Sequence, residues 1–172
     1  MKASIHMAGQ RFSAQRMLMD YANNFYVPAI KGAAKMTADG FELNRQVTSW
    51  LTNIYNSWDK VNIVEIFTPD FEESVHVGQV IPVQMKVQLG DISPDDVTVE
   101  IVAGRLDSRE RFTDFSPATA QLNGSGPAQD GVHSYVGEVT CHESGRFGVA
   151  ARVVPKNEHL LHTCKPKLIS WW

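Results

Sequence analysis

Apolar side chains recur at helical spacing in the first 26 residues. Met17, Leu18, Tyr21 and Phe25 stand at intervals that place them on one face of a helix, and Ser13 precedes the segment as a suitable N-cap. The pattern predicts a helix that begins at Ala14.

Pro28 interrupts this helical pattern. Proline has no N–H and disfavours helical angles at the residue before it, so a break or a new helix start is expected at Val27 and Pro28. The small residues from Ala29 to Ala34 fit one short helix.

The strongest helical pattern follows Asp39 and Gly40, which predict a break in the chain. Apolar residues then recur every three or four positions, with polar residues on the opposite face. The apolar positions are Phe41, Leu43, Val47, Trp50, Leu51, Ile54, Tyr55 and Trp58. This pattern predicts a helix from Phe41 to Trp58 with an apolar face that packs against other protein.

From Lys60 onwards the apolar residues alternate with polar ones, as in half-buried strands. The predicted strands cover residues 61–67, 83–89, 97–101, 135–141, 147–154 and 168–172. No helical stretch separates them, which favours an antiparallel immunoglobulin-like β-sandwich. The predicted fold class is therefore α+β, with a helical segment at 1–59 and a β-sandwich domain at 60–172. Residues 116–131 are rich in Gly, Pro, Ser and Asn and predict a mobile surface loop.

Length, charge and cysteine content narrow the function classes. At 172 residues the chain is too short for two nucleotide-binding halves, each on the order of 150 residues. The 16 Lys and Arg against 19 Asp and Glu give a net charge of −3, without the basic runs that bind nucleic acid or an anionic membrane. A membrane span requires about 20 apolar residues, and no apolar stretch of the sequence is that long. The N-terminus lacks the apolar central region of a signal peptide. Cys141 and Cys164 are too few for a disulfide framework, which favours a cytoplasmic location and leaves one bridge between them open.

Five cysteine and histidine residues in the C-terminal part of the chain have side chains of the types that bind zinc. They are Cys141, His142, His159, His162 and Cys164. Their spacing matches no common zinc pattern, and Cys141 would face inward on its strand. Isolated cysteines and surface histidines are therefore the favoured interpretation, and no metal ligand is assigned.

Other candidates for chemistry are also explained by ordinary structure. Ser144 is not part of a Gly-x-Ser-x-Gly elbow, so a turn serine is favoured over a nucleophile. The segment Gly124–Pro127 lacks the Lys-Ser/Thr of a phosphate loop. The mixed charges of Arg105–Phe112 favour a solvated strand edge or loop, with an anion or partner contact as the alternative. No catalytic or cofactor-binding residue is assigned.

The four tryptophans could stack on sugar rings. Trp50 and Trp58 lie in the helical apolar pattern, so core packing is favoured for them. Trp171 and Trp172 would alternate on a strand, which leaves at most one free to bind a ligand.

Seven segments spread over nearly the whole chain match a known protein family in their order. They are Met1–Ile5, Arg11–Met17, Tyr21–Ala29, Leu89–Val99, Ser144–Gly148, Arg152–Pro155 and Leu168–Trp171. Together they resemble the C-terminal region of bacterial α-glucan phosphorylases, of the glycogen and maltodextrin type. The N-terminal matches resemble the segment that follows the catalytic residues, and the later ones resemble a strand connection, a closing hairpin and a last strand.

This resemblance implies a fragment of a larger glycosyltransferase. Such enzymes use pyridoxal phosphate to transfer glucosyl units between an α-1,4-glucan and phosphate, giving glucose 1-phosphate. The cofactor is held by a lysine in a Gly-Thr-Gly-Asn-Met-Lys-like motif, which is absent here. The resemblance therefore implies a non-catalytic chain whose partner is the remainder of the parent catalytic domain.

A second function stays open: a carbohydrate-binding or oligomerisation module without catalysis, with an α-glucan or a second copy of the chain as partner. Under either function the face with Met17, Tyr21 and Phe25 is expected to be uncovered in this chain alone.

Overall fold

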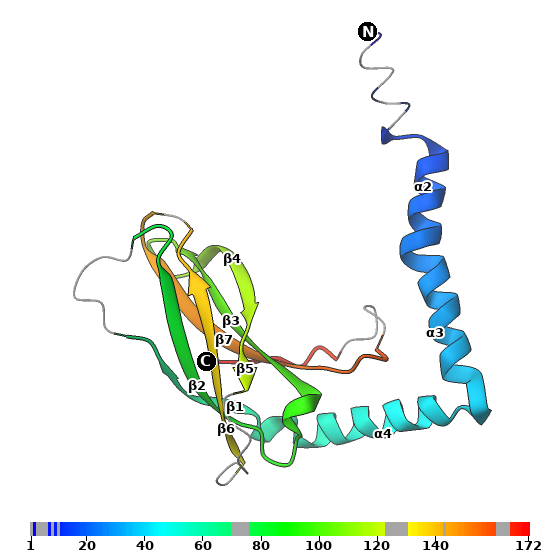
Figure 1. Cartoon of the computed structure of the whole chain (residues 1–172). Helices are drawn as coiled ribbons and strands as arrows, with labels where there is room; N and C mark the ends of the chain where they lie inside the picture. The colour runs from blue at the N-terminus through cyan, green and yellow to red at the C-terminus, as the bar shows by residue number, and fades with distance from the viewer. Residues whose placement is uncertain are drawn as a thin grey trace. The chain divides into compact units, whose positions relative to one another are not determined.

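The structure is a computed structural model that describes residues 2, 7, 9, 11–69, 76–122, 131–142, 144–160 and 166–172. The described residues form two compact units, and the division falls within helix α4 (Glu42–Ser57), after Trp50. The first unit contains the described residues up to Trp50 together with His159 and Leu160; the second contains Leu51–Glu158 and residues 166–172. Helices precede antiparallel sheets (Figure 1), so the predicted α+β class is confirmed.

The first unit begins with helix α2 (Ala14–Tyr21). Ser13 has extended angles, φ −73° and ψ 146°, and its Oγ accepts a hydrogen bond from the Arg16 N–H at 3.2 Å. This is the N-cap predicted from the sequence. A π-helical turn, η1 (Ala22–Tyr26), and helix α3 (Val27–Thr37) follow without a gap.

The start of α3 agrees with a new helix start at Pro28, but the expected loss of helical angles at Val27 is wrong. Val27 has φ −64° and ψ −47°, and its N–H reaches back five residues to the Ala22 carbonyl. Pro28 has no N–H to donate to the preceding turn, and the wide π turn η1 lies just before it. The helix therefore continues past Pro28 without a loss of helical angles.

Three successive residues with positive φ separate α3 from α4. Asp39, Gly40 and Phe41 have φ values of 49°, 65° and 68° and end the short 3₁₀ turn η2 (Ala38–Gly40). The next helix starts at Glu42, whose carboxylate accepts hydrogen bonds from Arg45 at 2.9 Å and Gln46 at 3.1 Å. The break predicted at Asp39 and Gly40 is confirmed, and the helix predicted for 41–58 is observed as α4 followed by η3 (Trp58–Lys60).

The described residues of the second unit form two four-stranded sheets in which all neighbouring strands are antiparallel. One sheet has the order β1-β2-β6-β5, with β1 at Asn62–Phe67, β2 at Val80–Gln88, β6 at Val132–Thr140 and β5 at Gln121–Leu122. The other has the order β4-β3-β7-β8, with β4 at Phe112–Thr119, β3 at Val97–Leu106, β7 at Phe147–Pro155 and β8 at Ser170–Trp171. A short 3₁₀ turn, η4 (Pro94–Asp96), leads into β3.

The sheets pack on each other through alternating side chains. On β2, Ile81, Val83, Met85 and Val87 are at most 3% exposed, whereas the residues between them are exposed. Gly137 of β6 lies so close to β3 of the other sheet that an added Cβ would be 2.6 Å from the Ile101 Cδ1. The core also contains Ile54 and Trp58 from the end of α4 and η3.

The loop predicted for residues 116–131 is wrong in its first part. Residues 116–119 belong to β4, and residues 121 and 122 form β5; residues 123–130 lie outside the described part. Strand β4 pairs with β3 through backbone hydrogen bonds while nearly all its side chains remain exposed. An exposed edge strand lacks the apolar alternation that marks a strand in sequence, and Pro117 is tolerated on such an edge.

In the described part of the chain, no helix combines the length and apolar character that a membrane span requires.

Candidate functional site

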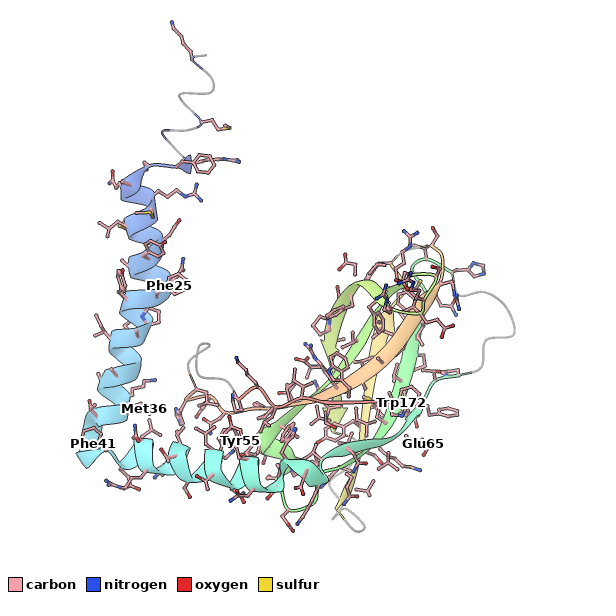
Figure 2. All side chains as sticks on the ribbon, turned by 180° about the vertical axis from the view of Figure 1, so that it is seen from behind. Phe25, Met36, Phe41, Tyr55, Glu65 and Trp172 are labelled. Carbon is pink, nitrogen blue, oxygen red and sulfur yellow. The ribbon has the colours of Figure 1, made fainter. Side chains whose placement is uncertain are left out.

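The helices of the first unit carry a large exposed apolar surface. It is formed by Phe12, Met17, Leu18, Met19, Tyr21, Phe25, Tyr26, Val27 and Ile30, each between 41% and 78% exposed, and we call it the helical apolar surface. No residue of α2, η1 or α3 is buried by the described chain. Figure 2 shows Phe25 projecting outward from the helix. The uncovered face predicted at Met17, Tyr21 and Phe25 is therefore confirmed.

Part of the helical apolar surface is hollowed and contains aromatic rings in contact. A hollow of about 530 Å³ is lined by the apolar residues Phe12, Met17, Tyr21 and Phe25 and by the charged residues Arg11, Arg16 and Asp20. The Tyr21 ring centroid lies 6.0 Å from that of Phe25 and 6.4 Å from that of Tyr26. Arg16 pairs with Asp20 at 3.5 Å. Apolar surface of this extent, bordered by charges, is typical of an interaction site.

A second hollow lies in the two-sheet unit, where strands of both sheets contribute to its wall. Its volume is about 330 Å³. Strand β3 contributes Ala103 to Arg105, β4 contributes Asp114 to Ala118, and β6 contributes Glu138 to Thr140. His142 and Phe147 complete the lining. We call this space the intersheet hollow.

The intersheet hollow has a mixed chemical lining. Arg105, Asp114, Glu138 and His142 are exposed, and Phe147 is partly exposed. Arg105 is the register partner of Asp114 on β4 and of Phe147 on β7, so the three residues form one row across three strands. Residues in such a row point to the same face of a sheet, which places a carboxylate, a guanidinium and a phenyl ring side by side.

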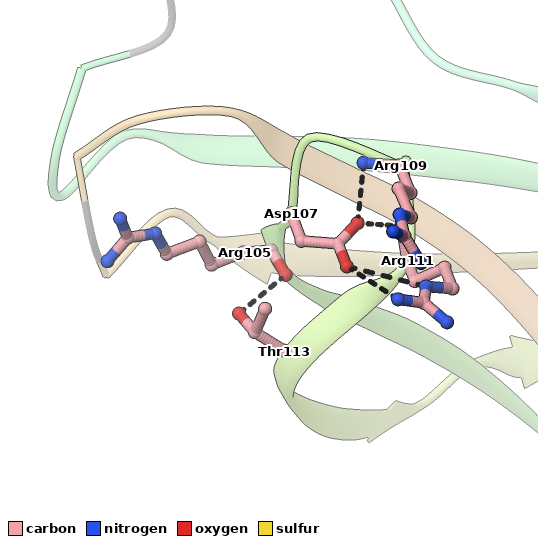
Figure 3. A network of polar contacts seen from close by, with 5 residues as sticks. All are labelled: Arg105, Asp107, Arg109, Arg111 and Thr113. Carbon is pink, nitrogen blue, oxygen red and sulfur yellow. Dashed lines mark hydrogen bonds and ion pairs between the residues drawn. The ribbon is translucent and has the colours of Figure 1, made fainter.

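Beyond this row, the turn between β3 and β4 is held by Asp107 (Figure 3). Its carboxylate accepts hydrogen bonds from the backbone N–H of Arg109 at 2.8 Å and of Arg111 at 3.0 Å, and from the Arg111 guanidinium at 3.3 and 3.4 Å. The backbone donor of Arg111 contributes most to holding the pKa of Asp107 below its usual value. The segment 105–112 is thus a solvated strand end and turn, as predicted.

The zinc-type residues are not brought together in the described structure. Cys141 is 2% exposed and faces inward as predicted, His142 is exposed at the rim of the intersheet hollow, and His159 belongs to the other unit. His162 and Cys164 lie outside the described residues. Among those described, no group of three or more His, Cys, Asp or Glu is placed to hold a metal ion.

The remaining candidates can be placed individually. Ser144 lies in the exposed bend between β6 and β7, in agreement with a turn serine. The segment 124–127 lies outside the described residues.

Trp58 is buried as expected, whereas the exposure of the two C-terminal tryptophans differs from the expectation. Trp58 is 8% exposed, which confirms core packing, and Trp50 is partly exposed. Trp171 and Trp172 are 50% and 61% exposed, so the expectation that one of the two rings faces inward is wrong. Strand β8 is a two-residue edge strand, and an edge so short leaves both rings accessible.

One face of Trp171 is occupied by a neighbouring charge. The Arg152 guanidinium lies 5.4 Å from the Trp171 ring centroid and pairs with Glu100 at 2.6 Å. Glu100, Arg152 and Trp171 are register partners across β3, β7 and β8. This ordered row ties the edge strand to the sheet.

Sequence reasoning missed the intersheet hollow. It considered Arg105 and His142 for other reasons and did not consider Asp114, Glu138 or Phe147. These residues lie far apart in the chain and meet only through strand pairing, so no local spacing signals them.

Comparison with known proteins identifies the family. Residues 58–172 match the family model described as glycogen phosphorylase C-terminal domain. The chain is 39% identical to the maltodextrin phosphorylase of Thermococcus litoralis over 176 residues, covering 99% of this chain and 20% of that protein. It is 24% identical to the glycogen phosphorylases of Mycobacterium bovis and Mycobacterium tuberculosis, covering 91% of this chain and 18% of each.

These matches agree with the resemblance noted in the sequence, and the chain spans about a fifth of the length of these curated relatives. The family model covers the whole two-sheet region, and the relatives also align with the helices. The chain belongs to the glycogen phosphorylase C-terminal domain family.

Proposed function

We propose that this chain is the C-terminal, non-catalytic region of an α-glucan phosphorylase. The parent enzyme transfers glucosyl units between an α-1,4-glucan and phosphate, giving glucose 1-phosphate. In this proposal residues 1–59 are the tail of the catalytic domain, and residues 60–172 are an appended immunoglobulin-like β-sandwich. The parent enzyme works in the cytoplasm.

The observation that carries the proposal is the helical apolar surface. Nine large apolar side chains stay exposed on a helical segment in which the described chain buries no residue of α2, η1 or α3. Leaving such a surface in water is unfavourable by roughly 25 cal/mol per Å² of apolar area. The proposed occupant is the catalytic region, since the maltodextrin phosphorylase that aligns with 99% of this chain is about five times as long.

The cofactor of the parent enzyme, pyridoxal phosphate, is assigned to the catalytic region. The lysine motif that holds it is absent from this sequence. Neither the intersheet hollow nor the hollow on the helices is lined by a lysine. No step of the reaction is therefore assigned to a residue of this chain.

The proposal is tested by complementation. The Thermococcus litoralis maltodextrin phosphorylase is truncated before the segment that aligns with this chain, and the 172-residue chain is added in trans. Formation of glucose 1-phosphate from maltoheptaose and phosphate is measured. We expect no product from this chain alone, little from the truncated enzyme, and restored activity from the mixture.

A matched pair of variants tests the docking surface. Phe25→Glu places a charge on the helical apolar surface, whereas Phe67→Glu places one at a phenyl ring of similar exposure on β1; the two rings are 57% and 59% exposed. We expect the first variant to lose complementation and the second to retain it. Product from the isolated chain, or equal complementation by both variants, would contradict the proposal.

A second candidate function is self-association through the same helices. The helical apolar surface would then be covered by a second copy of the chain. Sedimentation velocity distinguishes the two, because a homodimer that Phe25→Glu dissociates, without complementation by the wild-type chain, supports the oligomerisation module.

A further inference from the structure

We propose that the intersheet hollow binds a short segment of α-1,4-glucan through a row of three side chains, Asp114, Arg105 and Phe147. The inference rests on the proposed function for the choice of sugar and on the geometry of the hollow for the site. It assigns to the two-sheet unit a substrate-anchoring role away from the catalytic residues.

The hollow has the size of a small ligand site. Its volume of about 330 Å³ lies at the lower end of the about 300–1,000 Å³ found for ligand pockets. Neighbouring strands lie about 4.8 Å apart, so the row across β4, β3 and β7 extends over about 10 Å. One or two linked hexose units match that length.

The side chains of the row are available to a ligand. Arg105 and Asp114 are direct cross-strand partners, yet within the described residues they form no ion pair with each other or with another side chain. Instead, the Arg105 Nε lies 3.9 Å from the place that a Cβ on Gly145 would occupy, so the guanidinium reaches toward the turn after His142. Arg105 and Asp114 therefore offer the hollow a donor and an acceptor that are not paired with each other.

The chemistry of the lining suits a neutral polyol. A carboxylate only accepts hydrogen bonds and a guanidinium only donates them, so a pair of adjacent sugar hydroxyls can satisfy both. Phe147 offers an apolar face to the C–H groups of a pyranose ring. The row holds one carboxylate beside one guanidinium, so it presents no net positive charge that would attract phosphate or other anions.

Backbone geometry fixes one wall of the site. An added Cβ at Gly104 would overlap the Asp114 carbonyl oxygen and lie 2.8 Å from the Phe115 Cα. The absence of a side chain at Gly104 therefore lets β4 cross close to β3, which sets the position of Asp114 beside Arg105.

Binding is measured on the full 172-residue chain with maltoheptaose as the probe and cellohexaose, a β-1,4-linked glucan one unit shorter, as the linkage control. Isothermal titration gives the affinity, and amide chemical shifts locate the site. We expect maltoheptaose to bind at millimolar or lower concentration and to shift amides of residues 103–105, 114–118 and 138–142. Absence of binding, or shifts confined to other residues such as those around Trp171, overturns the site.

Matched arginine variants separate recognition from general charge. Arg105→Ala removes the donor of the row, whereas Arg109→Ala removes an exposed arginine of the same hairpin that does not line the hollow. We expect Arg105→Ala to weaken binding about tenfold, equivalent to about 1.4 kcal/mol, and Arg109→Ala to leave it unchanged. Equal effects overturn the proposal, and thermal unfolding confirms that both variants are folded.

The outcome is independent of the complementation test. A chain that restores phosphorolysis but does not bind maltoheptaose overturns the glucan site and leaves the proposed function standing. A chain that binds maltoheptaose in the hollow but never complements supports the site and contradicts the proposed function.

Discussion

Side chains of similar hydrophobicity have opposite environments in the two units. Phe12, Leu18 and Ile30 in the helical unit are 61–78% exposed, whereas Ile81, Leu89 and Ile101 in the two-sheet unit are at most 3% exposed. Both regions show a clear hydrophobic period in sequence. A hydrophobic period in the sequence therefore identifies which face of an element favours burial. The period does not say whether the surface that covers this face lies in the same chain.

The largest expected effect tests this difference in burial directly. Ile101→Ala removes a fully buried side chain between the sheets and should lower the free energy of unfolding by about 2–5 kcal/mol. Leu18→Ala, at 61% exposure, should change it by no more than about 0.5 kcal/mol. Urea unfolding measures both, and equal losses would remove the contrast between the units.

The tyrosines offer a pH test of the same contrast. Burial, with a smaller contribution from the charge of Asp95, raises the pKa of Tyr135 in the two-sheet unit to about 12, whereas Tyr21 and Tyr26 in the helical unit are 46% and 58% exposed. In the unfolded chain the phenol ionises near pH 10, whereas in the folded chain it stays neutral up to about pH 12. Between these values ionisation favours the unfolded chain, so the free energy of unfolding is undiminished below pH 10 and falls as the pH rises to about 12. The loss should approach about 2–3 kcal/mol.

Tyr135→Phe is the control for that pH dependence. Within the described structure the Tyr135 hydroxyl is buried without a hydrogen-bond partner, so its removal should cost little stability at pH 7. Unfolding of this variant should be less sensitive to pH between 10 and 12. An unchanged alkaline profile would show that other groups cause the loss.

A smaller effect is expected from the close approach of β3 and β4. Gly104→Ala forces a Cβ against the backbone of Asp114 and should destabilise the two-sheet unit by about 1–3 kcal/mol. Gly9→Ala is the matched change in the helical unit, since a Cβ there has no neighbour within 4 Å. Thermal unfolding compares the two, and a stability loss for Gly9→Ala as large as that for Gly104→Ala would contradict the argument.

The smallest effect on stability is expected on the helical apolar surface. Phe25→Glu exchanges an exposed ring for a charge and should change the free energy of unfolding by less than about 0.5 kcal/mol. The same variant should bind less of an apolar fluorescent dye than the wild type, because it divides the exposed surface. A large stability loss together with unchanged dye binding would show that Phe25 is buried in solution.

Sequence patterns predicted the elements in which apolar residues recur at a regular spacing, whether the apolar face is buried within the chain, as in β2, or exposed, as in α2. The helix α4 and the strands β2, β3, β6 and β7 were found because one face of each carries regularly spaced apolar residues. The second half of strand β4, residues 116–119, was predicted as a loop because its stabilisation comes from backbone pairing with β3, which leaves no mark on side-chain polarity.

The candidate sites differ in the same way. The helical apolar surface was predicted, since Met17, Tyr21 and Phe25 lie within eight residues of one another and share a helix face. The intersheet hollow was not, because Arg105 meets Asp114 and Phe147 only through the register of three strands. The spacing of residues along the chain is enough to predict the helical apolar surface. The intersheet hollow arises only when distant strands pair.

The edge strand β8 has a consequence for the time course of folding. The Ser170 Oγ donates to the Val61 carbonyl at 2.9 Å, which joins positions 109 residues apart, and Trp171 pairs with Arg152. Helices form within about a microsecond from local contacts, whereas folds dominated by distant pairings take milliseconds to seconds. The helical apolar surface would therefore be available to a partner long before the two-sheet unit closes, so docking and sheet closure become separate kinetic events.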